Sequence, residues 1–153
     1  MIKKIIYGIV GITAFIFSGC SSEESMEEWR PIAVEAEGVV LTSSVNGFLV
    51  SGVLSPQGGT YTFTPKSDSE SRIQSVNVNG KSFEVDYDWS SGIVAGETVC
   101  SGDWGEITYL NEEFPYEFGV TVNGNISSTS RKIEINVTGV YEKVTIELAQ
   151  GAE

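Results

Sequence analysis

The sequence predicts an all-β domain, a sandwich of two antiparallel sheets with about seven or eight strands. Three observations support this fold class. From about Val39 onward apolar residues alternate with polar ones, no stretch after residue 20 shows helical periodicity, and Gly, Asn, Ser and Pro separate the alternating runs. Short one-sided strands joined by frequent turns are typical of two sheets that pack face to face.

The clearest element is a β-hairpin predicted over residues 72–87 and centred on Asn79-Gly80. A two-residue type I′ turn needs positive φ at both central positions, which Asn-Gly adopts at low cost. The turn predicts three cross-strand pairs, Val78 with Lys81, Val76 with Phe83, and Gln74 with Val85. In this register the apolar members of both strands share one face, so the turn and the pattern predict the same pairing.

The other strands are predicted from the same alternation. Apolar residues occupy every second position in 61–63, 116–122, 133–137 and 144–148, and further strands are expected in 39–53 and 104–110. The runs 133–137 and 144–148 are separated only by residues 138–143, so they predict two adjacent strands with one apolar face each.

Residues 1–19 have the layout of a secretory signal, with two lysines, an apolar run from Ile5 to Phe17 and small residues at the end. The run is shorter than the ~20 residues that span a bilayer, so a permanent transmembrane helix is only the alternative. Phe17-Ser18-Gly19-Cys20 resembles the lipobox of bacterial lipoproteins, although Phe17 stands where Leu is usual. The resemblance implies that Cys20 is acylated and anchors the mature chain to the membrane; a chance cysteine near an ordinary cleavage site is the alternative.

Residues 20–38 predict a flexible acidic tether, which leaves 39–153 as the folded domain. This segment contains six glutamates, one arginine and one proline, without strand-like alternation. An alternative is that Trp29 and Ile32 dock on the domain as an extra edge strand. The run Ser21-Ser22-Glu23-Glu24 resembles the acidic export signal of surface lipoproteins in the Bacteroidetes. We therefore expect the protein in the cell envelope, anchored to the outer membrane and exposed at the surface.

The chain is strongly acidic, with 9 basic and 21 acidic residues and a formal charge of −12. Removal of Lys3 and Lys4 with the signal leaves 7 basic residues and a charge of −14. An anionic surface repels nucleic-acid phosphates and anionic lipid headgroups, so we expect neither as a partner through electrostatics.

Two distant segments, 55–67 and 120–151, resemble the BACON domain. The matching features are Gly58-Gly59 before an alternating strand, Asn125 six residues before Arg131, the strand Ile133–Val137, and a last strand that closes in Gln150-Gly151. The family usually has a tryptophan soon after its first alternating strand, where this chain has Lys66–Glu70. The resemblance implies an immunoglobulin-like module of an exported Bacteroidetes protein, of a kind often attached to carbohydrate-active enzymes.

The chain contains no histidine, which excludes Ser-His-Asp and Cys-His catalysis and the usual zinc sites. We therefore expect no enzyme activity, no cofactor and no bound metal. A calcium site at Asp86, Asp88 or Asp103 is an alternative to solvated carboxylates. With Cys20 lipidated, Cys100 has no partner in the chain, and we expect it to be a small buried apolar residue.

Aromatic residues interleaved with acids and glycines between Tyr87 and Phe118 would suit a surface that binds sugar rings. The candidate ligand-binding residues are Trp89, Asp103, Trp104 and Tyr109. Because Trp104 lies beside Gly102, Asp103 and Gly105, it is the residue most expected to be exposed. Burial in the core is the alternative, especially for Tyr87, Trp89, Tyr116 and Phe118, which continue apolar alternations.

These observations predict a lipid-anchored, non-catalytic module that binds glycan or another extracellular ligand. The alternative is a structural or accessory lipoprotein that packs on another envelope protein and binds no sugar. Exposed indoles in a groove would favour the first reading, and buried indoles with an apolar patch elsewhere would favour the second.

Overall fold

The computed structural model describes residues 28–85 and 91–153, and within these ranges it contains twelve strands and no helix. The prediction of an all-β sandwich is therefore confirmed, although the described residues form more strands than the seven or eight expected. The signal segment, Cys20 and most of the expected tether lie outside the described residues. The same is true of Asp86, Tyr87, Asp88 and Trp89.

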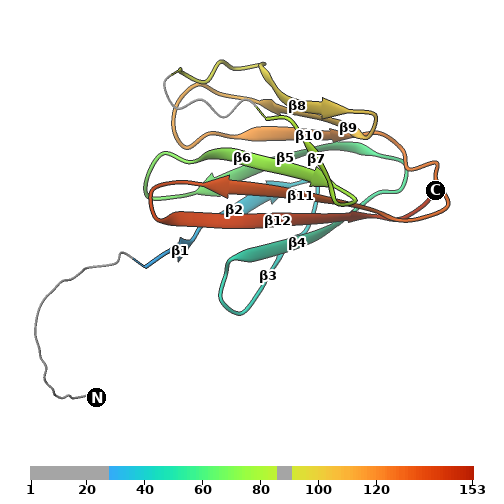
Figure 1. Ribbon diagram of the computed structural model, residues 1–153, viewed down its shortest axis with the longest axis horizontal. Helices are drawn as coiled ribbons and strands as arrows, with labels where there is room; N and C mark the ends of the chain where they lie inside the picture. Colours follow the sequence, from blue (N-terminus) through green and yellow to red (C-terminus); the bar gives the residue numbers. More distant parts are fainter. Residues whose placement is uncertain (1–27, 86–90) are drawn as a thin grey trace, which may run out of the picture.

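The strands form two sheets that lie against each other as layers (Figure 1). The larger sheet consists of β3 (Thr42–Ser43), β4 (Leu49–Leu54), β12 (Glu142–Gln150), β11 (Arg131–Thr138), β6 (Arg72–Val78) and β7 (Lys81–Phe83), with β1 (Arg30–Pro31) also paired to β12. The smaller sheet consists of β2 (Ala33–Glu37), β5 (Gly59–Lys66), β10 (Phe118–Val122), β9 (Gly105–Tyr109) and β8 (Thr98–Gly102).

The sheets are antiparallel except beside β12. On one side β12 pairs antiparallel with β11, whereas on its other side it pairs parallel with β1 and with β4. The prediction of purely antiparallel sheets is thus corrected at these two pairings. Parallel neighbours are far apart in sequence, so local alternation carries no sign of them.

The hairpin around Asn79-Gly80 has the predicted register over its first three pairs. Val78 faces Lys81 and Val76 faces Phe83, while φ is 52° at Asn79 and 81° at Gly80, as the type I′ turn requires. The expected pair of Gln74 with Val85 is not formed, because β7 ends at Phe83.

The core lies between the inner faces of the two sheets and is made by the predicted alternations. Each of the following side chains is at most 7 % exposed: Tyr61, Phe63, Val76, Val78, Phe118, Val120, Val122, Ile133, Ile135, Val137, Val144, Ile146 and Leu148. Phe63 of β5 stacks on Phe118 of β10 with ring centroids 5.6 Å apart. Burial of about 2 kcal/mol per large apolar side chain makes this interior the main stabilising contribution.

The boundary predicted between tether and domain at residue 38 needs correction. Arg30–Pro31 pairs with β12, Ala33–Glu37 pairs with β5, and Ile32 between them is 1 % exposed. The described domain therefore includes β1 and β2, as in the alternative in which this segment adds to the sheets. β1 and β2 are short, and the exposed face of β2 carries Glu35 and Glu37. In the sequence they are therefore hard to distinguish from an acidic linker.

After β2 the chain crosses from the smaller sheet to the larger one through residues 38–41. Val39 and Leu41 of this crossing cover Gly52 of β4, and a Cβ at Gly52 would lie 2.8 Å from Val39 Cγ2. Gly52 is therefore needed for the close approach of the crossing segment to β4.

We predict that Gly52→Ala destabilises the protein by about 1–3 kcal/mol, because the added methyl group overpacks the contact with Val39. Gly92→Ala is the matched control, since a Cβ there meets no atom within 4 Å. Urea unfolding measures both. Equal free energies of unfolding for the two variants would contradict the role assigned to Gly52.

Candidate functional site

The expected ligand-binding residues do not form one exposed site. Trp104 is 1 % exposed and Tyr109 is 6 % exposed, so both belong to the core, whereas Asp103 lies at the surface. Trp89 lies outside the described residues. Trp104 and Tyr109 flank β9 at opposite ends, five residues apart, which corresponds to roughly 16 Å along a strand. The prediction that Trp104 is exposed was wrong.

Trp104 is buried because the tight turn between β8 and β9 directs its indole inward. The ring packs edge-on against Phe83 with centroids 5.9 Å apart, and a Cβ at Gly102 would lie 2.7 Å from the indole Nε1. Gly102 thus provides room for the indole and does not mark an exposed loop. The indole N–H is buried and has no hydrogen-bond partner among the described residues. Such an orphan donor costs about 1–3 kcal/mol, so the packing of the ring outweighs it.

Tyr109 has a structural role at the other end of β9. Its hydroxyl oxygen accepts a hydrogen bond from the Ile73 N–H at 3.1 Å, which joins the smaller sheet to β6 of the larger one. Burial raises the pKa of Tyr109, and the hydrogen bond from Ile73 opposes that rise only in part. The Tyr109 ring is buried, and its neutral hydroxyl is bonded to the backbone of the opposite sheet. The residue therefore has no free face for a sugar ring.

Carboxylates and thiols do not converge on a metal site in the part of the chain that the structure describes. Asp103 is exposed at the β8–β9 turn, and the other two members of the alternative calcium site lie outside the described residues. Cys100 is 3 % exposed, as expected, and burial raises the pKa of its thiol. The thiol therefore remains protonated and unreactive at neutral pH.

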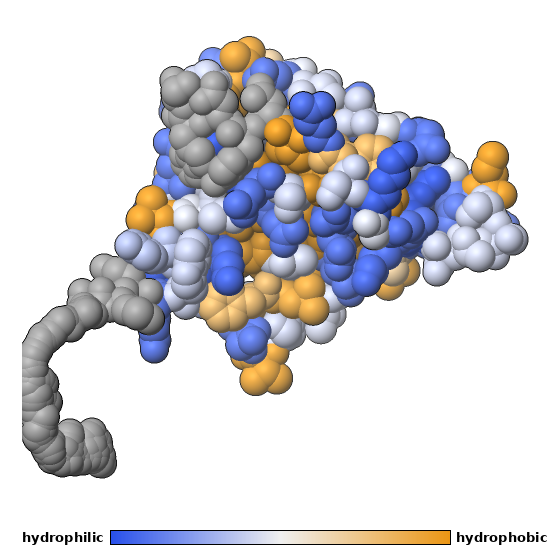
Figure 2. All heavy atoms as spheres, viewed as in Figure 1, coloured by the Kyte–Doolittle hydropathy of each residue, from blue (hydrophilic) through white to orange (hydrophobic). Residues whose placement is uncertain are grey.

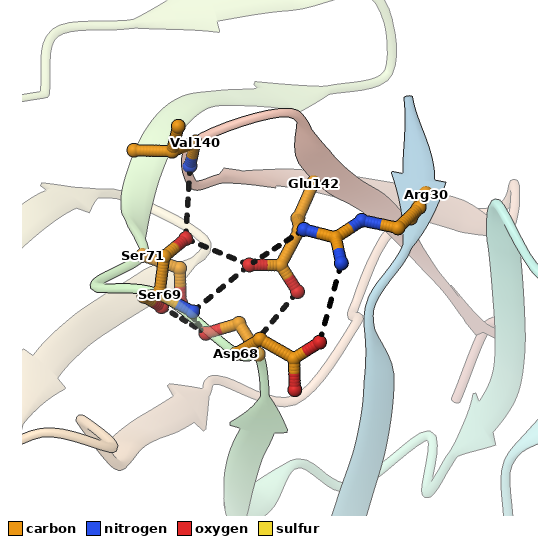
Figure 3. A network of polar contacts seen from close by, with 7 residues as sticks. Arg30, Asp68, Ser69, Ser71, Val140 and Glu142 are labelled. Atoms are coloured by element: carbon orange, nitrogen blue, oxygen red, sulfur yellow. Dashed lines mark hydrogen bonds and ion pairs between the residues drawn. The ribbon is translucent and has the colours of Figure 1, made fainter. Parts of the chain in front are cut away.

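A buried carboxylate, Glu142, organises a polar cluster that the sequence analysis did not anticipate (Figure 3). Its Oε1 accepts a hydrogen bond from the Asp68 N–H at 2.8 Å, and its Oε2 accepts bonds from the Ser69 N–H at 2.9 Å and Ser69 Oγ at 2.7 Å. Arg30 of β1 lies beside it, with Nη2 4.0 Å from Oε2 and Nη1 3.4 Å from Asp68 Oδ2. Three segments are therefore joined at one carboxylate: β1, the β5–β6 loop and the start of β12.

The pKa of Glu142 reflects this environment. Burial by itself raises it, but the hydrogen bonds from Asp68 and Ser69 together with the charge of Arg30 outweigh burial and hold the pKa below its usual value. These hydrogen bonds and the nearby guanidinium favour the ionised form of Glu142 and fix the orientation of its carboxylate. The cluster is a structural joint.

Gln150, the last residue of β12, forms the corresponding joint at the opposite end of the strand. It is 0 % exposed, and its Nε2 donates to the carbonyl oxygens of Ser55 and Asn123, each at 3.0 Å. Its Oε1 accepts a hydrogen bond from Arg131 Nη1 at 2.7 Å. Asn125, 1 % exposed, donates to the carbonyl oxygens of Gln150 and Gly151 beside it. These bonds tie the loops that follow β4 and β10 to the end of β12.

Two strongly exposed apolar residues lie near the β3–β4 edge of the larger sheet. Val40 is 86 % and Val53 77 % exposed, and both line a shallow cleft where the crossing segment meets β4. Figure 2 shows apolar side chains along the lower margin of the molecule, over β3 and β4. The sequence carried a signal for this edge, because residues 38–54 contain no charged residue in a chain that is 20 % charged.

Comparison with known proteins adds the fold alone. No protein-family model matches the chain, and no curated protein matches it. A solved structure, described as the NMR structure of the protein from Bacteroides thetaiotaomicron, is similar to it with a TM-score of 0.54 and 18 % identity. The similarity covers 88 % of this chain and 98 % of the other. Within the described residues no helix is long and apolar enough to cross a bilayer.

We predict that Trp104→Ala lowers the free energy of unfolding by about 3–5 kcal/mol, because it opens a large cavity at the end of the core. Trp104→Phe should cost clearly less, since the smaller ring fills part of the space and the orphan N–H is removed. Thermal unfolding measures both. A melting temperature unchanged by Trp104→Ala would show that the indole is not a core residue.

We predict that Glu142→Gln destabilises the protein at pH 7 by about 1.5–3 kcal/mol through loss of charge-assisted hydrogen bonds. A carboxyl whose folded-state pKa is lowered stabilises above its unfolded pKa of about 4.3, and this stabilisation is lost as the pH falls through the folded value. The wild type and the variant should therefore converge in stability as the pH falls below the unfolded pKa.

Urea unfolding at several pH values tests the role of Glu142. Glu35→Gln is the control, because Glu35 pairs with Lys66 at an exposed position and should change stability by less than about 1 kcal/mol. A constant difference between wild type and Glu142→Gln from pH 7 to pH 3 would contradict the prediction.

Proposed function

We propose that this chain is a lipid-anchored, non-catalytic module of the bacterial cell envelope whose sandwich domain binds another envelope protein. Cys20 carries the acyl chains, and the outer membrane is the proposed location. This is the accessory alternative of the sequence analysis, and one observation favours it over glycan binding. The described candidate aromatics are buried, while the largely exposed Val40 and Val53 line one cleft at an uncharged sheet edge.

The edge has the chemistry of a surface that pairs with another polypeptide. Proteins normally protect free sheet edges with lysine, proline or inward-pointing charges. Residues 38–54 carry none of these, and Val40 and Val53 are exposed side by side in the same cleft. A partner strand added to such an edge would gain backbone hydrogen bonds and bury both valines.

Glycan binding has less support. A sugar platform needs exposed aromatic faces with polar groups around them, and Trp104 and Tyr109 present none. Of the described candidate residues, Asp103 alone is exposed, and one carboxylate does not make a sugar site.

We also propose that the domain is BACON-like. The residues on which that resemblance rests come together in space: Asn125 donates to the carbonyl oxygens of Gln150 and Gly151, and Arg131 donates to Gln150. Gly58 contacts the end of β10 so closely that a Cβ there would overlap the carbonyl oxygen of Val122. A shared structural reason for these residues supports the proposal.

In-cell photo-crosslinking tests the protein partner. A photoreactive residue at position 53 should produce a discrete adduct with one envelope protein, because Val53 lies on the uncharged edge. The matched control is position 94, since Val94 is 55 % exposed but lies in the loop before β8, at the edge of the smaller sheet.

Two results would contradict the proposed function. One is the absence of any adduct from position 53, or the same adducts from positions 53 and 94. The other is tight binding of the purified protein to a glycan array that survives Val53→Asp, which would move the activity to a sugar site elsewhere.

A further inference from the structure

We infer that the end of the sandwich at which the N-terminal segment enters docks on a zwitterionic phospholipid surface and sets the orientation of the domain on the membrane. This inference rests on the proposed lipid anchor at Cys20. The tether-end surface, as we call it, consists of Trp29, Val45, Val140, Tyr141 and Lys143.

The two aromatic residues and the lysine of this surface are exposed and in contact with one another. Trp29 is 46 % and Tyr141 43 % exposed, and their rings meet edge-on with centroids 5.9 Å apart. Lys143 Nζ lies 5.2 Å from the Trp29 ring centroid. The Arg30 N–H donates to the Tyr141 carbonyl oxygen at 2.9 Å, which fixes Trp29 beside the β11–β12 turn. The aromatic pair is therefore held in place by the fold while still facing solvent.

Two valines extend the surface. Val140 is 60 % exposed beside Tyr141 in the β11–β12 turn, and Val45 is fully exposed in the β3–β4 turn. That second turn packs on the N-terminal strand, since a Cβ at Gly47 would lie 3.1 Å from the Pro31 ring. Figure 1 shows β1 entering between the β11–β12 turn and the β3–β4 turn.

The composition matches the interface of a bilayer. Trp and Tyr are enriched where hydrocarbon meets headgroups, because each has an apolar ring and a polar group that stays hydrated. At this interface the aliphatic part of a lysine side chain lies along apolar groups, and its ammonium group extends to the phosphate layer. Valines in turns add apolar area that can enter the boundary without burying the backbone.

The length of chain between the anchor and the domain favours a membrane as the occupant. Eight residues separate Cys20 from Trp29. A fully extended chain of that length spans at most about 32 Å, so Trp29 can never be farther than this from the acylated residue. Every other face of the domain can turn away from the bilayer, whereas the tether-end surface is always held near it. Even weak affinity then suffices, because the anchor supplies a high effective concentration.

Charge decides which lipid is suitable. Arg30 is neutralised by Asp68 and Glu142, which leaves Lys143 as the cation of this surface. The mature chain carries a formal charge of −14, so an anionic membrane would repel it. We therefore assign a zwitterionic headgroup, in which the phosphate is balanced by an amine.

The test uses the full-length lipidated protein reconstituted in phosphatidylcholine vesicles, with bromine atoms on the upper acyl-chain carbons as a quencher. Flotation of the vesicles reports the anchor, and tryptophan fluorescence reports the docking. Because Trp29 is one of three tryptophans, brominated lipid should quench up to about one third of the emission. Trp29→Leu should abolish this quenching. Val45→Ser should reduce it at least twofold, and Ile126→Ser, at the opposite end of β11, should leave it unchanged.

The outcomes distinguish docking of the tether-end surface from the lipid anchor at Cys20. A protein that floats and whose quenching responds to Val45→Ser but not to Ile126→Ser supports docking. A protein that floats without quenching, or with quenching equal in both serine variants, overturns docking and leaves the anchor in place. Failure to float, equal to that of Cys20→Ser, overturns the lipid anchor and with it the orientation that we infer.

Discussion

The structure depends above all on the pairing of β12, the last strand of the chain. β12 forms an antiparallel ladder with β11 on one side and parallel ladders with β1 and β4 on the other. It therefore connects the beginning, the middle and the end of the sequence in one sheet. Its inward residues Val144, Ile146 and Leu148 are at most 2 % exposed and contribute to the centre of the core. Neither the N-terminal segment nor β4 has a place in this sheet until β12 is present.

Both ends of β12 are secured by a buried polar side chain. Glu142, its first residue, binds the β5–β6 loop and faces Arg30, and Gln150, its last residue, binds the loops after β4 and β10. Buried polar groups are costly unless they are bonded, so each one specifies which loops must close around it. The apolar interior makes the sandwich stable, and these two residues determine how its ends are closed.

The sequence predicted most of what depends on local pattern. It gave the fold class, the type I′ turn at Asn79-Gly80 and the buried faces of β11 and β12, because alternation and turn chemistry are both read from neighbouring residues. It missed the parallel partners of β12 and the acidic strand β2, since long-range pairing leaves no local trace. For the candidate site, glycines around Trp104 suggested exposure but in fact make room for a buried indole. The roles of Glu142 and Gln150 depend on backbone donors from distant loops, which no spacing reveals.

The parallel pairing of β1 with β12 also has a mechanical consequence. The strands run in the same direction, so tension applied to residue 28 along the axis of β1 loads its backbone hydrogen bonds in shear, together with the contacts of Arg30 to Asp68 and Glu142. Bonds loaded together resist rupture better than bonds that are peeled apart one by one. The point at which the N-terminal segment joins the sandwich is thus built to bear a pulling force.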